Sequence, residues 1–91
     1  MQPQQPSIGR IVHYVLPEGP RRGEVRPAII VRRFTMIDPH VRPNVGMCNL
    51  QVLLDGGNDG LEGGLGGVVW KGSVLYSEAQ TPGTWHWPPR D

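Results

Sequence analysis

The sequence predicts an all-β fold, a small barrel of about five short strands. Three observations support this prediction. No window of a dozen residues repeats its apolar side chains with the period of a helix. The 91 residues include 13 glycines and 10 prolines, which divide the chain into short segments. Five of these segments are rich in apolar and β-branched residues, as strands are, whereas a two-sheet sandwich would need more of them.

The first half of the chain contains two of the predicted strands. Residues 1–7 are expected to form a polar N-terminal arm, and residues 8–91 a single small domain. The first strand, 7–16, is partly apolar on both faces, as a strand of a small barrel must be. A charged loop leads to the second strand, 26–34, which has an apolar centre. Pro27 near its start fits a sheet edge or a strand entry.

The second half contains three more predicted strands, and the five strands together suggest an SH3-like barrel. The third strand, 47–54, alternates most regularly, with Cys48 on its apolar face. The fourth strand, 68–76, and the fifth, 83–87, follow it. Between the third and the fourth, residues 55–67 contain seven glycines. This Gly-rich segment is expected to form a mobile hairpin loop.

Composition argues against several classes of site. The single cysteine, Cys48, cannot form an internal disulfide, has no companion for a metal site, and suits a reducing compartment. The polar N-terminus does not resemble a signal peptide, and no apolar run is long enough to span a membrane. We therefore expect no metal, no cofactor and no membrane partner.

Charge is unevenly distributed, although the net charge is only +1. Residues 1–45 carry seven arginines and three acidic residues, whereas residues 46–91 carry two basic and five acidic residues. Two interpretations follow: a half that binds anions, or a positive half that meets the negative half of another copy in a homo-oligomer. Binding along a nucleic-acid strand is a weaker option, because so small a net charge neutralises few phosphates.

The segment 81–90 is the strongest candidate for a binding site. On an extended backbone Trp85 and Trp87 point to one face and His86 to the other, and the flanking prolines stiffen the segment. Stiff aromatic side chains beside arginines are typical of binding surfaces, although tryptophans of a small barrel can equally belong to its core or to a contact between copies. The expected ligand-binding residues are Trp85, His86, Trp87, Arg90, Arg26, Arg10, His13, Tyr14 and Trp70.

Motifs for catalysis and for metal binding are not matched. His13 and His86 are each an acid–base candidate or a hydrogen-bonding partner for an anion, but neither has an identifiable partner in the sequence. The start of the Gly-rich segment is similar to a calcium loop, yet its third and twelfth positions are Gly57 and Gly66, which supply no carboxylate. We therefore expect no catalytic residue and no enzymatic activity.

Two resemblances add to these inferences. Residues 8–16 followed by residues 23–31 resemble the opening of the MazF/PemK-type toxin endoribonucleases, which have a glycine-led strand, a charged loop and an Arg-Pro-Ala strand. This resemblance implies an SH3-like barrel, and Arg26 is the only functional residue that it transfers. The later toxin segment with the catalytic threonine or serine has no counterpart here.

The second resemblance covers nearly the whole chain. The motifs that carry it are GRIVHY at 9–14, RPAIIV at 26–31, LQV at 50–52, WK at 70–71 and GTWHWP at 83–88. In this combination the chain is similar to a family of small proteins encoded in tailed-phage and prophage genomes. The resemblance implies a phage context, and it implies no activity and transfers no functional residue.

These observations lead to one main hypothesis and two alternatives. The main hypothesis is a non-catalytic, phage-associated oligomeric module in the host cytoplasm. It would bind an anionic planar ligand such as a linear or cyclic nucleotide, and so sequester a nucleotide signal of host defence. The first alternative is a virion structural protein, for example a capsid decoration or head–tail protein, whose partners are other phage structural proteins. The second alternative is a MazF-like endoribonuclease.

Overall fold

The described part of the chain consists of five strands and one short 3-10 turn. The structure, a computed structural model, describes residues 6–34, 46–59 and 67–89. Its elements are β1 (Ile11–Val15), β2 (Val25–Arg33), β3 (Cys48–Leu53), the 3-10 turn η1 (Gly56–Asn58), β4 (Val68–Val74) and β5 (Trp85–His86). The strands form one sheet in the order β4-β3-β2-β1-β5, and each neighbouring pair is antiparallel. The all-β prediction is confirmed.

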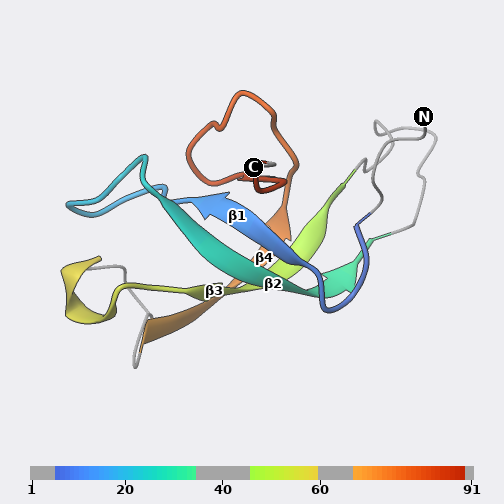
Figure 1. The fold of residues 1–91 in the computed structure, drawn as a ribbon, viewed down its shortest axis with the longest axis horizontal. Coiled ribbons are helices and arrows are strands. Elements are labelled where there is room, and N and C mark those ends of the chain that lie inside the picture. Colours follow the sequence, from blue (N-terminus) through green and yellow to red (C-terminus); the bar gives the residue numbers. More distant parts are fainter. Residues whose placement is uncertain (1–5, 35–45, 60–66, 90–91) are drawn as a thin grey trace.

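The sheet closes on itself at β5. On one edge β5 pairs with β1, where Trp85 lies opposite Tyr14. On the other edge the backbone N–H of Trp85 donates to the Leu75 carbonyl at 3.0 Å, and the Ser77 N–H donates to the Trp85 carbonyl at 2.9 Å. Leu75 and Ser77 lie within three residues of the end of β4, so the last strand connects both ends of the sheet. In Figure 1, β1 and β2 cross over β3 and β4, as expected for a small SH3-like barrel.

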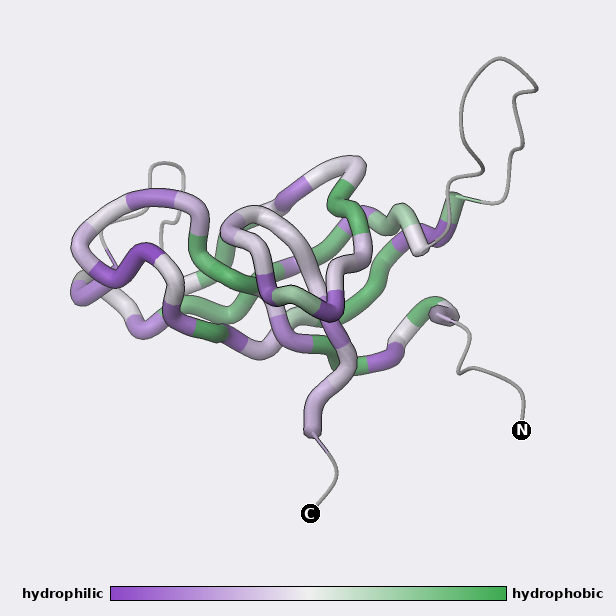
Figure 2. The backbone as a smooth tube through the Cα atoms, turned by 90° about the horizontal axis from the view of Figure 1, so that it is seen from above, coloured by the Kyte–Doolittle hydropathy of each residue, from purple (hydrophilic) through white to green (hydrophobic). Residues whose placement is uncertain are grey.

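The core lies between the crossing strand pairs. β3 alternates as predicted: Cys48, Leu50 and Val52 are fully buried, while Asn49 and Gln51 between them are not. Figure 2 shows the hydrophobic stretches of the backbone gathered where the strands cross, with largely hydrophilic loops extending to one side. The buried cluster comprises Val12, Tyr14, Leu16, Ala28, Ile30, Cys48, Leu50, Val52, Val69, Val74 and Trp85.

The first strand begins at Ile11, four residues later than predicted. The chain turns before it: Gly9 has a φ of +91°, and the N–H of Arg10 donates to the Ser7 carbonyl at 3.1 Å. A positive φ suits glycine and interrupts an extended backbone. Ile8 therefore lies on the exposed turn and not on the inward face.

The predicted fifth strand, 83–87, is assigned only as Trp85–His86. Its backbone pairing nevertheless starts where expected, because the N–H of Gly83 donates to the Val15 carbonyl at 2.8 Å and the N–H of Val15 donates to the Thr84 carbonyl at 3.0 Å. Of the predicted N-terminal arm and Gly-rich loop, residues 1–5 and 60–66 lie outside the described residues.

Candidate functional site

Trp85 belongs to the core. Its side chain is fully buried, and its indole Nε1 donates a hydrogen bond to the Gly46 carbonyl at 2.6 Å. The Tyr76 ring packs against it with centroids 4.9 Å apart. Gly46 has a φ of +77°, and a Cβ there would lie 2.8 Å from Cβ of Tyr76 and 3.2 Å from the indole, so the site requires glycine. The Trp85 ring is therefore part of the packed core, and it is not open to a ligand.

Trp87 lies at the margin of the same cluster. It is partly buried and packs edge-to-face on Trp85, with ring centroids 5.1 Å apart and planes at 90°. The guanidinium carbon of Arg10 lies over the Trp87 ring, 5.2 Å from its centroid. Arg10 is exposed, and among the described residues no carboxylate forms an ion pair with it. The structure thus brings two of the predicted binding residues, Arg10 and Trp87, together as a cation–π pair that packs on the buried Trp85 ring.

The two strand histidines form a second cluster. His13 and His86 lie directly opposite each other in the β1–β5 pairing, and their rings meet edge-on with centroids 5.7 Å apart. His86 is only 6% exposed, and its Nδ1 has no hydrogen-bond partner among the described residues. Burial lowers the pKa of His86, and the neighbouring His13 lowers it further. His86 is therefore neutral at physiological pH and cannot attract an anion by charge.

Tyr14 is also inside the barrel. It is buried in the core, where it lies opposite Trp85 on one side and Arg26 on the other. Burial raises the pKa of its hydroxyl, and the charge of Glu18 raises it further. The phenol is therefore protonated at physiological pH, and its burial makes it a packing residue.

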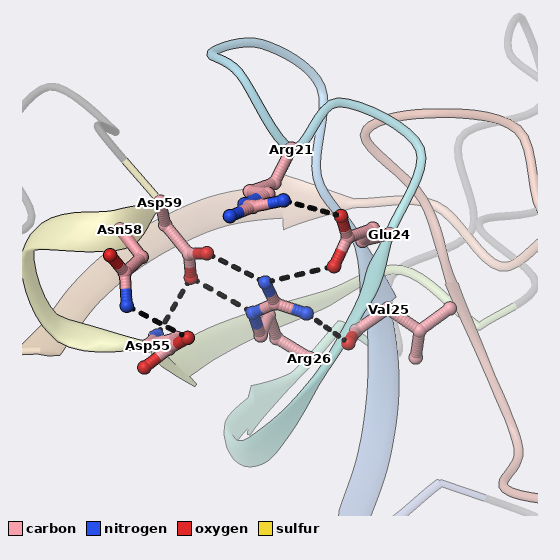
Figure 3. A network of polar contacts seen from close by, with 7 residues as sticks. All are labelled: Arg21, Glu24, Val25, Arg26, Asp55, Asn58 and Asp59. Carbon is pink, nitrogen blue, oxygen red and sulfur yellow. Dashed lines mark hydrogen bonds and ion pairs between the residues drawn. The ribbon is translucent and has the colours of Figure 1, made fainter.

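Arg26 lies in a polar network at the start of β2 (Figure 3). Its Nε donates to Asp59 Oδ2 at 2.9 Å and its Nη2 donates to Asp59 Oδ1 at 2.6 Å, which makes a bidentate ion pair. Nη2 also donates to Glu24 Oε1 at 3.2 Å, and Nη1 donates to the Val25 carbonyl at 2.9 Å. The backbone N–H of Asp55 donates to Asp59 Oδ2 at 2.7 Å. The guanidinium is therefore occupied by partners within the chain.

The network joins two segments that are far apart in the sequence. Asp59 is fully buried and follows η1, whereas the Arg26 side chain is 16% exposed. The hydrogen bonds from Arg26 hold the pKa of Asp59 below its usual range, against the effect of burial. The hydrogen bond to Asp59 likewise raises the pKa of Arg26 further above its ordinary value. Both groups are therefore charged at physiological pH, and their ion pair holds the loop after β3 against β2.

Trp70 is separate from the terminal aromatic segment. It lies on the outer face of β4 and is 57% exposed, whereas Trp85 lies inside the barrel. Its indole lies over Gly72, where an added Cβ would come within 2.5 Å of Cη2 of the ring. Arg90, another predicted binding residue, lies outside the described residues.

Sequence reasoning missed three residues that shape this region: Asp59, Gly46 and Tyr76 as packing partner of Trp85. The Gly-rich segment was predicted as a mobile hairpin loop that does not match a calcium loop, and none of its acidic residues was predicted as the partner of an arginine. The surplus of arginines in the first half and of acids in the second was the available signal for the Arg26–Asp59 pair.

No group of three or more His, Cys, Asp or Glu side chains that could hold a metal ion occurs within the described ranges. No helix in that part of the chain is long and apolar enough to cross a membrane. Comparisons of the chain with protein-family models, with curated proteins and with solved structures give no match.

Proposed function

We propose that this chain is a non-catalytic, phage-associated binding module that acts as an oligomer. Its ligand is an anionic planar molecule such as a linear or cyclic nucleotide. The observation that carries the proposal is the Arg10–Trp87 pair, in which an exposed guanidinium lies over an indole that rests on the core. Within the described ranges no acidic side chain pairs with Arg10, and its exposed guanidinium presents a planar set of N–H donors that suits an anion.

A nucleotide matches both parts of this pair. Its base can stack on the Trp87–Arg10 surface, and stacking on an aromatic side chain is worth roughly 1–3 kcal/mol per base. Its phosphate can accept hydrogen bonds from the guanidinium, which presents them in a planar fork. The edge-to-face contact with the buried Trp85 fixes the position of the Trp87 ring. The Trp87–Arg10 surface is therefore ordered before the ligand binds.

Sequestration requires tight binding and no bond-making chemistry. The resemblance to phage and prophage proteins suggests the host cytoplasm as the place of action. The proposed role there is to remove a nucleotide signal of host defence. The described residues support a binding role because the aromatic pair carries an exposed cation.

Titration calorimetry with a panel of linear and cyclic nucleotides tests the proposal. We expect heat of binding for at least one nucleotide, and a loss of affinity of at least about tenfold in Arg10→Ala and in Trp87→Leu, because tenfold corresponds to about 1.4 kcal/mol. Arg32→Ala is the matched control, since Arg32 also stacks on an aromatic ring, Phe34, at 4.7 Å. No heat with any nucleotide and folded protein refutes the proposal, as does an equal loss in the control.

The endoribonuclease alternative depends on Arg26. The bidentate bond to Asp59 occupies that guanidinium, so RNA cleavage by Arg26 would require the ion pair to open. Incubating an RNA with the wild-type chain and with Arg26→Ala tests this alternative. The virion alternative is tested by mass spectrometry of purified particles, in which the chain would have to be present.

A further inference from the structure

β4 is an edge strand with an unpaired side. It pairs with β3 along residues 68–74, and no other described strand pairs with it over that length. Closure of the barrel uses only the residues after β4, because the bonds to Trp85 come from Leu75 and Ser77. The backbone N–H and C=O groups on the free side of β4 can therefore pair with another strand.

The sequence of β4 protects this edge only weakly. Natural edge strands are usually blunted by proline, by several charges or by a bulge. β4 contains no proline, and Lys71 is its one charged residue. The register between β3 and β4 shifts near Ser73, which has a φ of +54°. Regular pairing with β3 therefore covers residues 68–71, and the irregularity protects only the C-terminal part of the strand, where Val74 pairs again with Cys48.

The outer face beside the edge is apolar. Trp70 lies opposite Gln51 of β3, and Val68 lies opposite Leu53, so these four side chains share one face. Trp70, Val68 and Leu53 are all exposed large hydrophobic residues. None of the four is charged, and depletion of charge is typical of the centre of a protein interface.

We propose that a second copy of this chain docks on this edge, with β4 pairing antiparallel to β4 of the other copy about a twofold axis. A twofold axis makes self-pairing of one strand antiparallel, and the same surface serves both copies. With the axis at Trp70, Val68 lies opposite the partner's Gly72, and the partner's indole, which lies over its own Gly72, faces Val68. The two indoles then lie on the same face near the centre of a continuous sheet.

The size of the surface sets the strength of this contact. A stable interface covers about 800 Å² per partner, which is roughly an eighth of the 6192 Å² surface of this chain. One strand edge and three apolar side chains cover less than that, so the dimer belongs to the weak class. We expect a dissociation constant on the order of micromolar to tens of micromolar. A second copy fits better than a different strand because it brings an identical unpaired edge and an identical indole.

This inference rests on the oligomer part of the proposed function and names its surface, whereas nucleotide binding does not depend on it. Sedimentation velocity of the full chain from about 1 to 200 µM tests it, a range that brackets the expected constant. Trp70→Lys removes the central indole and sets two charges against each other at the axis. Ile11→Lys is the matched control, because Ile11 is also 57% exposed but lies on β1.

We expect the wild-type chain and Ile11→Lys to shift from monomer to dimer over this range, and Trp70→Lys to stay a monomer. Val68→Lys provides a second disruption on the same face, and far-UV circular dichroism checks that every variant is folded. If the wild-type chain associates but Trp70→Lys and Val68→Lys associate equally well, the surface is wrong while self-association stands. A wild-type chain that stays monomeric at the highest concentration overturns this surface and the oligomeric part of the proposed function together.

Discussion

Replacing Asp59 with asparagine removes the charge from the buried end of the Arg26–Asp59 pair and keeps the shape of the side chain. Removing one partner of a buried ion pair costs about 3–5 kcal/mol, because the other charge is left without compensation. Arg26 is 16% exposed and keeps its contact with Glu24 at 3.2 Å, so we expect a smaller loss, about 2–3 kcal/mol.

Urea unfolding, followed by tryptophan fluorescence to which the buried Trp85 contributes, measures this loss. A loss of that size lowers the midpoint by about 1–2 M for a small domain. Asp55→Asn is the control: it makes the same change in charge next to η1, at an exposed carboxylate that accepts only a 3.3 Å bond from Asn58. We expect it to stay within about 0.5 kcal/mol of the wild type. An Asp59→Asn midpoint as high as that of the control would refute the view that this pair fastens the loop.

Two further predictions concern glycine geometry and pH. Gly46→Ala should lower the melting temperature by more than Gly23→Ala, because both have a positive φ but only the Gly46 site has atoms within 3 Å of the new Cβ. The positive φ alone costs about 1–2 kcal/mol, so equal shifts would contradict the packing argument. The folded chain holds the pKa of His86 below its ordinary value of about 6.5, so stability is present above that pH and is lost as pH falls below it. His86→Phe should flatten the melting temperature between pH 7 and 5 (roughly the histidine range), and an unchanged slope in the variant would contradict this assignment.

Local pattern was enough to predict much of the fold. β3 was predicted with its correct inward face because strict alternation of apolar residues is a property of the strand itself. Trp85 and Trp87 were predicted on one face, and both do pack against the core. The sequence could not decide that Trp85 is sealed and Trp87 marginal, because that difference arises from the position of the barrel end and from Gly46.

The pattern of apolar and polar residues could not predict contacts between segments that are far apart in the sequence. Arg26 and Asp59 are 33 residues apart, and neither residue alone indicates the other. The pairing of His13 with His86 depends on the register between the first and last strands, and this register cannot be derived from the sequence alone. The closure of the sheet through Trp85 depends on bonds to residues after β4, and these form only once the whole barrel is assembled.

The buried thiol of Cys48 can report on the opening of the barrel. The side chain is inaccessible in the core and burial raises its pKa, so a thiol reagent can react only when β3 separates from its neighbours. Under conditions of rapid reclosing, the labelling rate then measures the free energy of that separation. Agreement with the free energy from urea would mean that the barrel opens as one unit, whereas faster labelling would reveal a local route into its core.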